Sequence, residues 1–365
     1  MKYSDIMQTR YWTPARKFRL VRRTLLAVSL VALMAVRFIP GGGEFYASHL
    51  YPAISSALSA VSLLTTYSLE EIYVVLATVM LITYPVIARV RYLKWNHVAI
   101  TEMEIVLGVY SWFYWGWGLN YFRDSFYERQ SVKPAKYDKE AFRSFLKEYT
   151  FELNRSEQES AGKRIDRKSI KKDIRNGYNR ERDLHGLCEA KDRFEPKKTL
   201  FNGLYSGVGV SGYMGPFFCE MQINGDLPDE QFAFTYAHEL AHMLGVSSEA
   251  EANFWAYSMC SMSENAQVKN GGYFGILPYV ASSASYLLDE KDFKEWADSI
   301  DKRVLEKHKR IREYWAGLYC PTVGAVQDWT YDLFLKGNNV SSGVRNYSEV
   351  IGMIMSVREK NNKKK

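Results

Sequence analysis

Three apolar stretches lie in the first third of the chain, whereas charged residues recur throughout the remainder. The stretches cover about residues 24–39, 72–88 and 105–122. An α-helix rises about 1.5 Å per residue, so each stretch is close to the shortest helix that crosses a hydrocarbon layer of about 30 Å. The pattern therefore predicts three membrane-spanning helices.

A further uncharged stretch, residues 50–69, is also long enough to be a span. In that case only Glu70 and Glu71 would separate it from the next span, and Arg89 and Arg91 would lie outside the cytoplasm. We therefore interpret residues 50–69 as an interfacial or re-entrant helix.

Basic residues predict the orientation, because loops rich in lysine and arginine stay in the cytoplasm. Seven basic residues precede residue 24, and three lie between residues 89 and 104, whereas none lies between residues 40 and 71. The path is then in, out, in, out. It divides the chain into a basic cytoplasmic N-terminus (1–23), a membrane region (24–122) and an extracytoplasmic domain (123–365).

The last two thirds of the chain have the pattern of a mainly helical, water-soluble domain. An aromatic-rich and β-branched segment, residues 213–224, predicts one strand, so the fold class is mainly α (α+β). Helical periodicity is present over residues 139–153, 229–244, 249–262 and 292–318.

Composition excludes a disordered chain, because 15% of the residues are aromatic. The 48 basic and 41 acidic residues give a net charge of only +7. The basic run within residues 156–192 is interrupted by acidic residues, so we interpret it as a solvated helical face. We therefore expect the lipid bilayer and a peptide or protein substrate as partners, and no nucleic acid.

The four cysteines all lie in the predicted extracytoplasmic domain, where disulfides are permitted. Their spacing matches no zinc-finger pattern, and unpaired buried thiols are an equal alternative. They are Cys188, Cys219, Cys260 and Cys320.

The segment His238-Glu239-Leu240-Ala241-His242 carries the clearest chemical signal. Residues four apart on a helix stand one above the other, so both imidazoles can bind one ion, and zinc suits such a pair. A catalytic zinc has three protein ligands and leaves a fourth position to water. The pattern therefore predicts a zinc cofactor bound by His238 and His242.

Candidates for the third ligand follow directly. Gly245 fits the C-terminal cap of the first helix, and Ser247 or Ser248 can cap a second one. A short turn between the two helices would direct Glu249 or Glu251 back towards the histidines.

His238-Glu239-x-x-His242 followed by Glu249-x-x-x-Asn253 resembles the gluzincin pattern of thermolysin-like peptidases. The resemblance implies Glu249 as the third ligand, with Glu251 as the alternative. Asn253 stands where those enzymes have an acidic residue that supports a zinc histidine. Gly245 is also similar to the metzincin pattern, but Ser248 occupies the place of the third metzincin histidine, which disfavours that family.

The whole layout is similar to an uncharacterised bacterial family of three-span membrane proteins with an HExxH zincin domain. The features that carry the resemblance are the aromatic end of the third stretch (residues 115–123), the Gly-Pro-Phe-Phe-Cys-Glu segment and the HExxH helix. It implies a multi-pass protein of the bacterial inner membrane with a zincin-like, periplasmic domain that contains a small antiparallel sheet.

In the implied mechanism, Glu239 is the general base that takes a proton from the attacking water. The upstream strand would bind an extended peptide as an added strand, through Gly215, Phe217, Phe218, Cys219 and Glu220. Donors for the oxyanion are weakly indicated. They are Tyr273, with Tyr279 and His308 as further possibilities.

Zinc peptidase activity is therefore the leading hypothesis. The alternative is a zinc-binding scaffold or interaction protein that hydrolyses nothing. An intramembrane protease is disfavoured, because only about 14 largely apolar residues surround the HExxH motif, too few to cross a bilayer.

Overall fold

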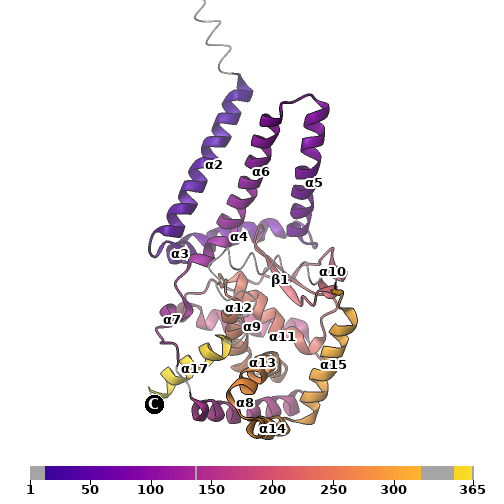
Figure 1. The fold of residues 1–365 in the computed structure, drawn as a ribbon. Helices are drawn as coiled ribbons and strands as arrows, with labels where there is room; N and C mark the ends of the chain where they lie inside the picture. Colours follow the sequence, from indigo (N-terminus) through magenta and orange to yellow (C-terminus); the bar gives the residue numbers. More distant parts are fainter. Residues whose placement is uncertain (1–12, 136–137, 322–348, 364–365) are drawn as a thin grey trace, which may run out of the picture.

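The computed structural model describes residues 13–135, 138–321 and 349–363 (Figure 1). It confirms a mainly helical fold with one small antiparallel sheet. Three helices lie side by side and point away from the rest of the chain, which forms a globular part. We refer to these helices as the projection. They are α2 (Pro14–Phe38), α5 (Leu69–Val90) and α6 (Trp95–Gly116).

Within the described residues, α5 is the one helix that is by itself long and apolar enough to cross a membrane. A second candidate exists if α2 and the following segment Gly42–Ser62 are taken together, although these are bent by 115°. The third predicted span, residues 105–122, is displaced along the chain. α6 begins earlier, at Trp95, and ends at Gly116, and a 3-10 helix, η2 (Gly118–Phe122), follows. Three spans therefore remain a prediction.

The segment between α2 and α5 crosses the base of the projection (Figure 1). It consists of α3 (Gly42–Phe45), a π-helical turn η1 (Tyr46–Leu50) and α4 (Tyr51–Ser62). One face of α4 is buried, through Tyr51 and three serines at helical spacing. Ser68 then caps α5 by accepting from the main-chain N–H of Glu71.

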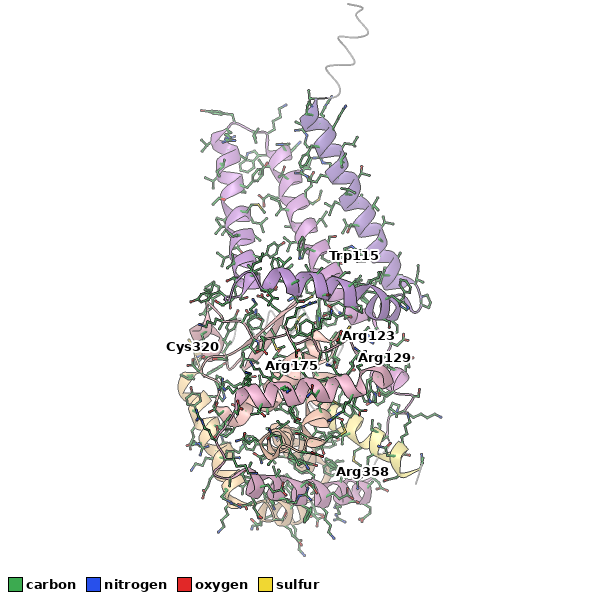
Figure 2. All side chains as sticks on the ribbon, turned by 180° about the vertical axis from the view of Figure 1, so that it is seen from behind. Trp115, Arg123, Arg129, Arg175, Cys320 and Arg358 are labelled. Carbon is green, nitrogen blue, oxygen red and sulfur yellow. The ribbon has the colours of Figure 1, made fainter. Side chains whose placement is uncertain are left out.

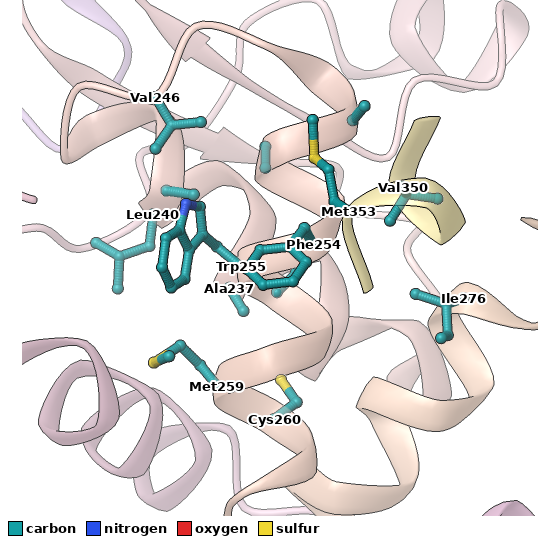
Figure 3. Packing of buried hydrophobic residues seen from close by; sticks show 14 of the residues in the cluster. Ala237, Leu240, Val246, Phe254, Trp255, Met259, Cys260, Ile276, Val350 and Met353 are labelled. Carbon is teal, nitrogen blue, oxygen red and sulfur yellow. The ribbon is translucent and has the colours of Figure 1, made fainter. Parts of the chain in front are cut away.

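The globular part is built around two packed helices, α11 (Asp229–Met243) and α12 (Glu249–Ser261). Trp255 of α12 is fully buried and packs beside Ala237 and Leu240 of α11 (Figure 3). On the other side of α12, Met353 belongs to the C-terminal helix α17 (Glu349–Asn362). The surrounding helices are α7 (Phe126–Arg129), α8 (Lys139–Ser160), α9 (Arg167–His185), α10 (Asn202–Gly207), α13 (Ala266–Leu287), α14 (Glu290–Asp298) and α15 (Lys302–Leu318).

Two sequence predictions for the globular part are wrong. The periodic segment 292–318 is two helices, α14 and α15, because Asp301 caps a new helix at Lys302. The predicted strand 213–224 is a hairpin of β1 (Gly212–Gly215) and β2 (Glu220–Ile223). Gly212 pairs with Ile223 and Gly215 with Glu220.

No disulfide joins the four cysteines, all of which lie in the described part of the chain. Cys219 and Cys260 are fully buried.

Candidate metal centre

A tight turn joins α11 to α12 and brings the facing ends of the two helices together. Gly245 follows α11 with a φ of +93°, a left-handed conformation that a side chain disfavours. The hydroxyl of Ser248 caps α12 by accepting from the main-chain N–H of Glu251. Both residues have the capping roles that the sequence predicted.

This turn groups His238, His242 and Glu249, whose ligand atoms all lie within 4.8 Å of one another. His238 Nε2 lies 3.1 Å from His242 Nε2 and 3.1 Å from Glu249 Oε2. His242 Nε2 lies 3.7 Å from the same oxygen. With zinc–ligand bonds of about 2.0–2.2 Å, the ligand atoms of a tetrahedral site lie about 3.3–3.6 Å apart. The three atoms are therefore close to the spacing that one zinc ion requires. We call these three residues the ligand cluster.

The outer ring nitrogens of both histidines are held by acceptors. His242 Nδ1 donates to the main-chain carbonyl of Val246 at 2.7 Å, and His238 Nδ1 donates to Asn253 Oδ1 at 2.9 Å. Because Nδ1 carries the hydrogen, Nε2 of each neutral ring presents a lone pair to the cluster. Two lone pairs and the Glu249 carboxylate then converge without a donor among them. Such an arrangement requires a cation or a proton at its centre.

The electrostatics of the ligand cluster reflect the same requirement. Burial opposes protonation of His242, yet Glu249 and Glu239 raise the pKa of this imidazole to about 9. Desolvation opposes ionisation of Glu249, yet the two imidazoles hold the pKa of its carboxyl well below the usual range. A proton and a divalent metal therefore compete for the same place.

Glu239 lies beside the ligand cluster on α11 and is only 4% exposed. Its Oε2 is buried and has no hydrogen-bond partner among the described residues. Burial raises the pKa of Glu239 to about 7, although the two neighbouring histidines lower it. An unsatisfied buried carboxylate is unfavourable for folding and marks a candidate functional group.

Glu251, the alternative third ligand, points elsewhere. Its carboxylate forms a buried ion pair with Arg129 at 2.5 Å and accepts from the indole of Trp255 at 2.9 Å. The structure therefore groups Glu249, and not Glu251, with the two histidines.

Asn253 occupies the position next to His238 that the gluzincin resemblance implied. Its side-chain N–H donates to the hydroxyl of Tyr279 at 3.1 Å, which leaves Oδ1 to face the imidazole. Asn253 thus fixes the ring without adding a negative charge.

The proposed oxyanion donors are distributed differently from the prediction. The ring of Tyr273 packs against the rings of Tyr149 and Tyr257. His308 lies on α15 beside Phe274. Tyr279 is the one of the three that is linked to the cluster, through Asn253.

The predicted substrate-binding residues contact the projection and its base instead of the ligand cluster. The main-chain N–H of Phe217 donates to Glu70 at the start of α5 (2.9 Å), and the Glu220 carboxylate accepts from Ser62 and Ser68 (2.6 Å each). These residues form the turn end of the hairpin, which lies against Glu70 and Gly116, whereas Gly212 at the other end lies against Glu239. The residues concerned are Gly215, Phe217, Phe218, Cys219 and Glu220.

Sequence analysis missed the residues that hold the end of α11. The indole of Trp117 donates to the carbonyl of His242 at 2.9 Å, and the Tyr51 hydroxyl donates to that of Met243 at 2.8 Å. Arg123 donates to the carbonyl of Gly245 at 3.1 Å. The cluster of aromatic and polar residues after the third apolar stretch was the one signal that pointed to this segment.

A further missed residue is Tyr121 of η2. Its ring meets that of Trp117 edge to face, with centroids 5.3 Å apart, and Trp117 in turn contacts the ring of His242. Tyr121 is therefore closer to the ligand cluster through its contacts than Tyr273, and is the better candidate for a donor at this site.

Comparisons with known proteins give one match. Neither curated proteins nor solved structures gave a match. A protein-family model described as "Protein of unknown function (DUF3810)" matches residues 46–355, which include the base of the projection, the ligand cluster and α17 up to Met355. The chain belongs to the DUF3810 family.

Proposed function

We propose that this protein is a membrane-anchored zinc peptidase that hydrolyses peptides or envelope proteins outside the cytoplasm. The observation that carries the proposal is the convergence of two imidazole lone pairs and one carboxylate on a point that requires a cation or a proton. Two histidines and one glutamate form a ligand set typical of catalytic zinc in peptidases. When bound there, zinc would polarise a substrate carbonyl and lower the pKa of a water molecule.

The environment of Glu239 favours a catalytic role for the metal over a purely structural one. Its unpartnered Oε2 is available to accept a proton from the attacking water and to deliver it to the leaving amine. A pKa of about 7 suits a group that must both accept and return a proton near neutral pH.

The outer edge of β1 is the proposed site for an extended substrate. The main-chain N–H of Asn224 donates to the carbonyl of Ser211, so antiparallel alternation directs Tyr213 and Gly215 towards β2. The main-chain groups of Gly212 and Met214 then point away from β2, and a peptide can pair with them. Gly212 lies against Glu239, which places this edge beside the proposed base.

The projection is the proposed membrane anchor. Many of its large apolar side chains are exposed, which is unfavourable in water and favourable in a bilayer. Arg22 and Arg23 pair with Glu104, so charges that precede the first and third predicted spans lie at one level. At the other end, the Arg37 guanidinium lies 5.0 Å from the Phe122 ring centroid. α2 and α6 run towards the globular part and α5 runs away from it (Figure 1), as three spans with an extracytoplasmic domain require.

Zinc content and hydrolysis together test the proposal. The full chain is purified in detergent, and we expect about one zinc per chain, with loss of zinc in His238→Ala. The control is His97→Ala, which removes an exposed imidazole outside the ligand cluster. Equal zinc in wild type and His238→Ala would refute the metal site. Zinc binding without cleavage of a random peptide library would favour the non-catalytic scaffold.

A further inference from the structure

The Trp117 side chain lies between the end of α6 and the ligand cluster. Trp117 follows the last residue of α6, and its indole donates to the carbonyl of His242. The two rings also meet edge to face, with centroids 6.2 Å apart. Since the last carbonyls of a helix lack partners within the helix, these side-chain donors fix α11 relative to α6. Arg123 lies just below the base of the projection (Figure 2).

A cavity of about 550 Å³ lies between α2, α4 and α6 and is open to the outside of the projection, where Leu25 of its lining is 65% exposed. Its lining is almost entirely apolar, and Trp115 and Gly116 contribute to it. Trp115 lies at the base of the projection (Figure 2). Two hydroxyls form the polar part of the lining. Ser29 and Ser111 are 2.5 Å apart, and the Trp115 indole donates to Ser29 at 2.9 Å.

The β1–β2 hairpin lies between the cavity and Glu239, the proposed general base. At one end of β1, a Cβ on Gly212 would lie 2.9 Å from Glu239 Cγ. At the other end, the carbonyl of Pro216 lies 2.6 Å from the Cβ position of Gly116, and the carbonyl of Phe217 accepts from the Trp112 indole at 2.8 Å. Gly116 and Trp112 both line the cavity. The four residues of β1 thus extend from Glu239 to the residues that line the cavity.

We propose that the substrates are lipid-modified polypeptides, whose acyl chain occupies this cavity while the adjoining residues pair with the outer edge of β1. This inference rests on the proposed peptidase function. A volume of about 550 Å³ suits a small apolar ligand. A transmembrane helix, about 10–12 Å wide, is a bulkier membrane anchor than an acyl chain and serves as the comparison.

The geometry also sets the position of the cut. An N-terminally acylated chain that enters at Gly215 and runs towards Gly212 adds to β1 in the antiparallel direction. At about 3.3 Å per residue, four residues span about 13 Å. Water then adds across a peptide bond about four residues from the acylated one, and gives a short lipopeptide carboxylate and a new amine.

The test uses one random peptide library in three forms: free, N-palmitoylated, and fused to a transmembrane helix. The full chain is reconstituted in vesicles of phosphatidylethanolamine and phosphatidylglycerol, and products are mapped by mass spectrometry. We expect the palmitoylated form to be cleaved about tenfold faster than the helix-anchored form, about four residues from the lipid. The helix-anchored form controls for simple enrichment at the membrane.

A cavity variant checks the acyl site itself. Gly108 lines the cavity, and an added Cβ there meets nothing within 4 Å, so Gly108→Leu places bulk in the cavity from an unobstructed position. We expect it to bring the ratio of palmitoylated to helix-anchored cleavage close to one. Ala27→Leu, which adds three carbons at an exposed position on α2 outside the cavity lining, should leave the ratio unchanged.

The outcomes separate the two proposals. Cleavage of all three forms at equal rates, dependent on Glu239, would overturn the acyl site and leave the peptidase standing. The same holds if Gly108→Leu leaves the preference intact, which is the result expected if membrane phospholipid fills the cavity. Failure to cleave any form, with zinc bound, would overturn both.

Discussion

Gly212 of β1 leaves the space that the Glu239 side chain occupies. A Cβ atom on Gly212 would lie 2.9 Å from Cγ of Glu239 and 3.0 Å from its Oε1, closer than such atoms approach in proteins. The backbone of Gly212 does not have a positive φ. Position 212 therefore requires glycine because β1 passes close to Glu239, and not because of its backbone conformation.

Gly212→Ala should therefore displace Glu239 and lower peptide hydrolysis. Misplacement of a catalytic group by about 1 Å can cost about 100-fold in rate, and we expect a loss of about 10- to 100-fold. Zinc content should not change, because the atoms nearest the added Cβ belong to Glu239 and Gln222 and not to the ligand cluster. Both quantities are measured on the same preparation.

The matched control is Gly203→Ala in α10, where an added Cβ meets nothing within 4 Å. It should retain full activity. If Gly212→Ala were as active as Gly203→Ala, the placement of Glu239 against β1 would have no catalytic meaning.

Glu239→Gln tests the proposed base directly. The amide keeps the shape but cannot take a proton, so hydrolysis should fall by about 10²- to 10⁴-fold while zinc is retained. Because a buried, unpartnered carboxylate is replaced by a neutral group, thermal unfolding should shift to higher temperature. Calorimetry and a peptide assay measure the two effects. A variant with wild-type turnover would remove Glu239 from the mechanism.

The sequence predicted α11 and α12 to within one residue at each end, because caps and turn residues are local. Gly245 and Ser248 mark the turn between them, and the short turn reduced the candidates for the third ligand to Glu249 and Glu251. Between Glu249 and Glu251 the sequence had no physical criterion. The partner of Glu251 is Arg129, which is 122 positions away along the chain.

The hairpin and the side chains that hold the end of α11 could not be predicted from the sequence either. The turn between β1 and β2 contains no pair of residues that is typical of a two-residue turn, so the segment 213–224 reads as one strand. Trp117 and Tyr51 are residue types that are typical of the membrane interface. Their hydrogen bonds to carbonyls of α11 join residues more than 120 positions apart, so they depend on tertiary packing.

Zinc affinity should rise with pH. The pKa of His242 is raised to about 9 in the metal-free cluster, so below that pH zinc must displace a proton. We expect the apparent affinity to increase about tenfold per pH unit between pH 6 and 8 and to level off near pH 9. Competition titrations measure the affinity, and calorimetry in buffers of different ionisation enthalpy counts the released proton. An affinity that does not change over this range would contradict the assignment.

The cysteine thiols should be inert in the folded chain. Burial raises the pKa of Cys188 to about 11 and also raises those of Cys219 and Cys260. Since the thiolate is the reactive form, alkylation at pH 8 should be slow and should accelerate as the pH approaches 11. Mass spectrometry after iodoacetamide treatment measures it, with the same chain in guanidinium as the control. Fast labelling of these three residues in the folded protein would contradict their burial.

Glu249 and Glu251 should respond to substitution in opposite ways. Glu249 lies in the ligand cluster and its side chain is 40% exposed, so Glu249→Ala should abolish zinc binding and destabilise the metal-free chain less than Glu251→Ala does, through loss of the contact with the imidazoles. Glu251→Ala leaves the buried Arg129 guanidinium without its partner, which typically costs about 3–5 kcal/mol. That variant should bind zinc whenever it is folded. Zinc content and denaturant unfolding distinguish the two. If Glu251→Ala loses zinc while Glu249→Ala retains it, the third ligand is Glu251, and the two helices must be arranged differently in the metal-bound protein.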